Sequence, residues 1–234
     1  MSKTHREALR LLPACSVIRH ALALVLLPFV ITVPALSWAE DLDGVRPLLT
    51  QEQVQSTLSK DAQWLDDAQS IESFLNDVDR SPPSWNELYG DEGAGHDERL
   101  FALNRERDRL REQRGEFTHR LTFLWAGELS SYDAERGGFH VAVGPKLIPT
   151  RWGIVRFKPE ELPSNLVALR PPTLKESLHR RAGLGERIDI DVATTGRLIP
   201  EESIIYDFAH DEPGRGMVMP VVRIERIDYI LKQE

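Results

Sequence analysis

The segment His119-Arg-Leu-Thr-Phe-Leu-Trp-Ala-Gly-Glu-Leu129 decides the fold class of this 234-residue chain. Every second residue from Leu121 to Trp125 is apolar, and Leu124 adds an apolar residue to the opposite face. A period of two with apolar residues on both faces is typical of a strand in the middle of a sheet. From Phe117 onward the sequence therefore predicts a β-rich domain.

Further segments with a period of two follow, up to the end of the chain. Apolar and acidic residues alternate over Ile188–Val192, which predicts a strand with one solvated face. The last strand changes phase between Ile224 and Ile227, so we expect a bulge at Glu225-Arg226. Other strands are expected at 139–143, 152–157, 166–169 and 203–208, and a short helix at 173–183. Residues 117–234 thus predict a small bent sheet or partly open barrel with one helix.

Residues 40–116 have the period of a helix instead. Apolar residues recur at spacings of three and four between Val54 and Val78, and a break near Ser59–Asp61 would divide this stretch into two helices. The segment Arg80-Ser-Pro-Pro-Ser84 ends the pattern, because proline lacks the N–H donor that a helix needs. The predicted fold class is α+β, with a helical N-terminal segment followed by a β-rich domain.

The helix expected at Asp97–Arg114 has an unusual composition. Its arginine and acidic side chains nearly balance, unlike basic helices that bind phosphates, and they predict a solvated helix with local ion pairs. Each such pair contributes only about 0.3–0.5 kcal/mol. The apolar side is a narrow seam of Leu100, Leu103 and Leu110. A seam of this kind packs on its own domain, on an envelope protein or on a second copy of the chain, and we expect it to be an interaction site.

The first 39 residues have the features of an export signal. Basic residues precede an apolar run from Ala21 to Ala39, and Ser37-Trp38-Ala39 places small residues at −3 and −1 of a cleavage point. We expect cleavage between Ala39 and Glu40, which gives a periplasmic or secreted protein that is not held by the membrane. A spanning helix needs about 20 apolar residues, so an uncleaved N-terminal anchor is the alternative.

The composition of residues 40–234 argues against two classes of partner, nucleic acids and anionic membranes. The formal net charge is −8 for the whole chain and −11 once residues 1–39 are removed. That charge repels nucleic acid and anionic lipid head groups, so neither is expected as a partner. The single cysteine, Cys15, lies within the signal, so the exported part has no disulfide and must depend on a hydrophobic core.

Sequence motifs for catalysis are scarce. The chain has no Gly-x-Ser-x-Gly and no His-Glu-x-x-His pattern, and its exported part has no cysteine nucleophile. The densest cluster of ligand-type residues comprises Asp207, His210, Asp211 and Glu212, whose oxygens and imidazole are groups that bind divalent metals. The same residues suit a polar strand end that enters a turn, and metal sites usually draw ligands from several elements. We therefore expect no metal and no cofactor.

Together these features predict an exported non-enzymatic protein that binds or organises a partner in the bacterial envelope. One alternative is a hydrolase of envelope polymers, assisted by a metal at Asp207 and His210. The other is a periplasmic domain that stays anchored through its N-terminus.

Overall fold

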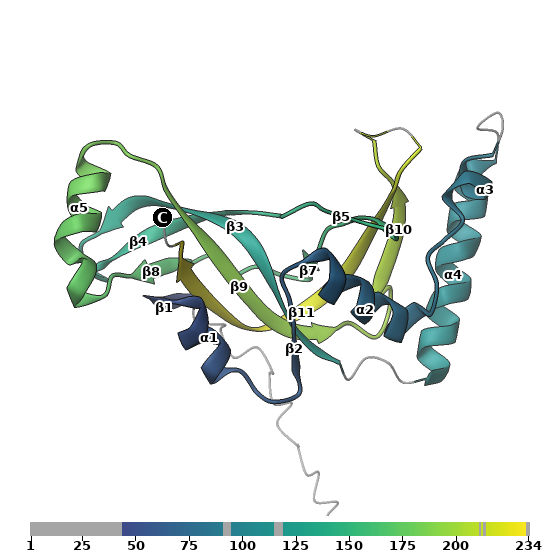
Figure 1. Cartoon of the computed structure of the whole chain (residues 1–234), viewed down its shortest axis with the longest axis horizontal. Helices are drawn as coiled ribbons and strands as arrows, with labels where there is room; N and C mark the ends of the chain where they lie inside the picture. The colour runs from purple at the N-terminus through teal and green to yellow at the C-terminus, as the bar shows by residue number, and fades with distance from the viewer. Residues whose placement is uncertain (1–43, 91–94, 115–118, 211, 213, 233–234) are drawn as a thin grey trace, which may run out of the picture. The chain divides into compact units, whose positions relative to one another are not determined.

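The computed structural model describes residues 44–90, 95–114, 119–210, 212 and 214–232, which belong to one compact unit (Figure 1). The predicted signal at 1–39, its cleavage point between Ala39 and Glu40, and the boundary expected after residue 116 all lie outside these residues.

Strands dominate this part of the chain, and most of the helices precede the long strands. The strands are β1 (Val45–Leu49), β2 (Ala62–Leu65), β3 (Arg120–Asp133), β4 (Gly138–Gly144), β5 (Ile148–Thr150), β6 (Gly153–Val155), β7 (Lys158–Pro159), β8 (Val167–Leu169), β9 (Ile188–Leu198), β10 (Ile204–Phe208) and β11 (Gly216–Leu231). The helices are α1 (Gln51–Thr57), α2 (Ala68–Asp79), α3 (Trp85–Tyr89), α4 (His96–Arg114) and α5 (Lys175–Gly183), with a 3-10 turn, η2 (Pro172–Leu174), before α5.

Six strands close into a barrel. Their order is β1-β8-β4-β3-β9-β11, and β11 also pairs with β1. The β-rich domain is thus confirmed, but the barrel is closed, whereas the sequence predicted a bent sheet or a partly open barrel. Closure depends on β1, which runs parallel to both of its neighbours and aligns Leu48 with Tyr229 of β11. The sequence pattern did not predict this strand, because it is short and its partners lie more than a hundred residues away.

The first half of β11 extends beyond the barrel and joins a second sheet. There it pairs with β10 in the antiparallel sense and with β6 in the parallel sense, and β5 adds to β6. In the pairing of β11 with β9, the register shifts between Ile224 and Arg226, which confirms the predicted bulge. The long strand therefore links the barrel to the sheet on which α3 and α4 lie (Figure 1).

The stretch predicted as helical contains strands as well. The break expected at Ser59–Asp61 is present, since α1 ends at Thr57 and α2 begins only after β2. Ala62 and Leu65 have the spacing of a helical stripe, but the structure corrects that interpretation. They begin and end β2, which runs parallel to β3 and buries Leu65 completely. A spacing of three over four residues does not distinguish the two structures.

One apolar core connects the helices to the barrel. The ring of Phe157 stacks on Phe123 of β3, with centroids 4.6 Å apart, and lies 6.5 Å from the ring of Phe74 of α2. Trp125 and Trp152 are both buried. Residues from the predicted helical and β-rich parts therefore share this core.

Helix α3 sits on the second sheet because one glycine leaves room for it. A Cβ atom on Gly216 of β11 would lie 1.9 Å from the ring of Trp85. The indole Nε1 of Trp85 donates a hydrogen bond to the carbonyl of Trp152, at 2.7 Å. This contact fixes α3, and with it the start of α4, beside β10.

Candidate functional site

Helix α4 covers the edge of β10 that faces away from β11 (Figure 1). The side chain of Asn104 takes the place of a neighbouring strand there. Its Nδ2 donates to the carbonyl of Tyr206, its Oδ1 accepts from the Tyr206 N–H, and both hydrogen bonds are 2.8 Å long. An exposed strand edge favours unwanted pairing, so this amide both fixes the helix and protects the edge.

Arginines of α4 also bind the carbonyl ends of two other helices. Arg99 donates to the carbonyls of Leu88 and Tyr89 at the end of α3, at 2.9 Å each. Arg114 donates to the carbonyl of Val78 in the last turn of α2. The last carbonyls of a helix have no partner within it, so cationic donors stabilise them. These contacts tie α4 to α2 and α3.

Arg111 is fully buried at the centre of an ionic network. Its guanidinium donates to Asp79 of α2 at 2.6 Å, to Asp108 one turn earlier, and to the carbonyl of Ile204 at 3.1 Å. Burial disfavours the cation most strongly, but the charges and hydrogen bonds of Asp79 and Asp108 together outweigh it and raise the pKa of Arg111. The Tyr206 hydroxyl also donates to Asp79, and burial together with that negative charge raises the pKa of Tyr206 well above its ordinary value.

Arg107 lies one turn before Arg111 and is held by the same network. It donates to the Tyr206 hydroxyl at 2.8 Å, and its Cζ lies 4.7 Å from the centroid of that ring. The prediction of a solvated helix with only local ion pairs is therefore wrong for this face of α4. The pair Arg111–Asp108 is local, but Asp79, the acid that makes burial of Arg111 tolerable, comes from another helix.

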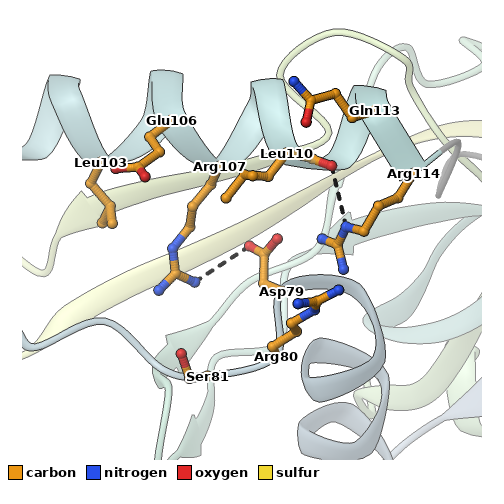
Figure 2. Close-up of a pocket in the computed structure, with 9 residues that line it drawn as sticks. All are labelled: Asp79, Arg80, Ser81, Leu103, Glu106, Arg107, Leu110, Gln113 and Arg114. Atoms are coloured by element: carbon orange, nitrogen blue, oxygen red, sulfur yellow. Dashed lines mark hydrogen bonds and ion pairs between the residues drawn. The ribbon is translucent and has the colours of Figure 1, made fainter.

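A pocket of about 530 Å³ opens between the end of α2 and the second half of α4 (Figure 2). Asp79, which belongs to the ionic network, lies between the two helices, and leucines of α4 give the pocket an apolar wall (Figure 2). The lining residues are Asp79, Arg80, Ser81, Leu103, Glu106, Arg107, Leu110, Gln113 and Arg114.

Arg80 has the most unusual backbone in this pocket. Its φ is 70° and its ψ is −41°, a combination that residues with a side chain rarely adopt. The N–H of Ser81 donates to the carbonyl of Asp79 at 2.9 Å and closes a three-residue turn around Arg80. Such a conformation costs about 1–3 kcal/mol and persists where the surrounding structure enforces it. The Arg80 guanidinium has no ion pair or hydrogen bond with the residues that the structure describes.

The three leucines of the predicted seam have different environments. Leu100 is buried in the core and Leu103 is partly buried against it, whereas Leu110 is 40% exposed at the pocket. On another face of α4, Phe101 is 63% exposed, with the guanidinium of Arg105 over its ring. One end of the seam therefore packs on the domain itself, and the other end forms an uncovered apolar wall.

The acidic cluster at the end of β10 has local partners. Asp207 accepts a hydrogen bond from the next main-chain N–H at 2.8 Å, and Glu212 pairs with Arg215 at 2.6 Å. His210 is exposed, and Asp211 lies outside the described residues. Among the residues with a described position, no three His, Cys, Asp or Glu side chains are placed to hold a metal ion.

Sequence reasoning found the leucines of this site but missed Asp79, Arg80 and Arg111. For Arg111, the sequence did contain one signal. The apolar spacing that begins at Leu100 continues along the same face as arginines at spacings of four and three, so the stripe changes in chemistry but not in period.

Comparison of the chain with protein-family models, with curated proteins and with solved structures finds no match. Within the described ranges, no helix is long and apolar enough to cross a membrane.

Proposed function

We propose that this chain is an exported, non-enzymatic protein that binds a partner through the pocket between α2 and α4. One observation carries the proposal. An exposed apolar wall at Leu110 and a cation at Arg80 that has no partner among the described residues lie in the same pocket, between helices that are fixed by buried contacts. A site whose parts are already ordered binds without the entropic cost of ordering them.

The chemistry of the pocket supports binding over catalysis. Guanidinium groups stay protonated at physiological pH, so the arginines that line it are poor general bases. The carboxylate of Asp79 accepts from both Arg111 and Tyr206, which leaves it poorly placed to take a proton from a substrate. Ser81 is the one lining residue with a hydroxyl, and no histidine lines the pocket to activate it.

The export part of the proposal rests on the sequence of residues 1–39, with cleavage after Ala39. The net charge of −11 that remains suits a protein that works in solution outside the cytoplasm. The binding part rests on the pocket alone, so each part has its own test.

Complex size in envelope extracts tests the binding part. The wild type should migrate as a species larger than its monomer, and Leu110→Glu should migrate as the monomer while it keeps its melting temperature, because Leu110 is already partly solvated. Leu184→Glu is the matched control, since Leu184 is 71% exposed next to α5, at the far end of the barrel from α4 (Figure 1). A wild-type monomer, or an equal loss in both variants, would refute the proposal.

A further inference from the structure

We infer that the occupant of this pocket is a short acidic amphipathic helix of a partner protein. One of its carboxylates pairs with Arg80, and an apolar side chain contacts Leu103 and Leu110. This inference rests on the proposed function and names the class of ligand.

The shape of the pocket favours a helix over a small anion. Its lining runs along α4 from Leu103 to Arg114, a distance of about 16 Å at the rise of an α-helix. Leu103, Arg107, Leu110 and Arg114 form a ridge with spacings of four, three and four, the heptad spacing of a helix face that packs against a second helix. A phosphate ion or a single carboxylate would contact only one end of this ridge and none of its apolar surface.

The charge of the lining selects acidic residues, although the whole chain is acidic. The cations Arg80, Arg107 and Arg114 outnumber the carboxylates of Asp79 and Glu106. Asp79 is also neutralised from behind by the buried Arg111, at 2.6 Å. The surface offered to a ligand is therefore positive, and a guanidinium group binds a carboxylate through two parallel hydrogen bonds.

The backbone of Arg80 identifies it as the anchor. Glycine is the usual residue where a helix ends with a positive φ, because it has no Cβ to clash. Here an arginine occupies that position, at the end of α2, and its side chain is among those that line the pocket (Figure 2). The turn that strains the backbone is the turn that presents this unpaired cation to the pocket.

Selection from a displayed library of random 16-residue peptides tests the inference. The bait is the protein purified from an exporting host. We expect the selected peptides to be rich in Asp and Glu, with apolar residues at spacings of three and four. Their affinity should fall at least tenfold in Arg80→Gln and stay unchanged in Arg109→Gln, a matched control on the exposed face of α4. Inorganic phosphate at millimolar concentration should not displace them.

A second readout separates the anchor from a structural residue. Arg80→Gly should bind the selected peptides at least tenfold more weakly and melt at the same temperature as the wild type or higher, since glycine relaxes the turn. Peptides that are neutral or basic, affinity that does not depend on Arg80, full displacement by phosphate, or a lower melting temperature in Arg80→Gly would each overturn the inference. If complex size still depends on Leu110 after such a result, the proposed function stands and only the ligand class fails.

Discussion

Arg111 shows how strongly one residue depends on partners that are distant in sequence. A buried guanidinium is tolerated only when its charge and its donors are matched, and Asp79 and the Ile204 carbonyl come from elements far along the chain. The spacing of the arginines is visible in the sequence, but their partners are not. For this reason the sequence predicted solvated arginines where the structure buries one of them completely.

Arg111→Met should lower the free energy of unfolding by about 3–5 kcal/mol, because Asp79 then stays buried without its cation. Chemical denaturation measures this value. Arg109→Met, on the exposed face of the same helix, should change it by less than about 0.5 kcal/mol. The double variant Asp79→Asn/Arg111→Met should lose less than the two single changes combined. Equal losses for Arg111→Met and Arg109→Met would contradict the network.

The raised pKa of Tyr206 predicts a loss of stability at alkaline pH. Above about pH 10 an unfolded tyrosine releases its proton, while the buried Tyr206 keeps it. The folded state then binds more protons than the unfolded state, so the free energy of unfolding falls as the pH rises. Denaturation at pH 8 and pH 11 should show a smaller fall for Tyr206→Phe than for the wild type. Identical falls would show that Tyr206 titrates normally.

At the scale of elements, local sequence patterns predicted individual helices and strands, but they did not predict which distant strands pair. The apolar period and the prolines that follow it gave the end of α2, and the change of phase gave the bulge at Ile224–Arg226. In contrast, β1 and β2 pair in parallel with strands that follow them at a distance, and their few residues carry little pattern of their own. The pocket was therefore predictable only in part. Leu103 and Leu110 belong to an apolar stripe that the sequence shows, whereas the position of Arg80 depends on a turn that has no sequence signature.

The docking of α3 on the second sheet depends on Gly216. Gly216→Ala should cost about 1–3 kcal/mol of stability or more, because the added methyl group overlaps the ring of Trp85. Displacement of Trp85 should also shift the tryptophan fluorescence towards longer wavelength. Gly144→Ala is the control, since a Cβ there meets no atom within 4 Å. A stable Gly216→Ala protein with unchanged fluorescence would rule out this close contact.

At the scale of the whole molecule, the barrel is completed by β1, a strand close to the predicted cleavage point. β1 begins at Val45, five residues after the predicted new N-terminus at Glu40, so a folded protein needs nearly all of the chain beyond the signal.

The mass of the mature protein tests the predicted export and the predicted cleavage between Ala39 and Glu40. Material recovered from the periplasm or medium of a bacterial host should have the intact mass of residues 40–234. A protein that keeps residues 1–39 and sediments with membranes would support the anchored alternative in its place.

The central claim is that the α2–α4 pocket contacts a partner, and position-resolved photo-cross-linking in exporting cells tests it most directly. A photoreactive residue in place of Leu110 should cross-link to a second polypeptide, because this side chain forms the exposed wall of the pocket. The same residue in place of Leu184, which is more exposed but lies beside α5, should not. Equal cross-linking from both positions, or none from position 110, would contradict the claim.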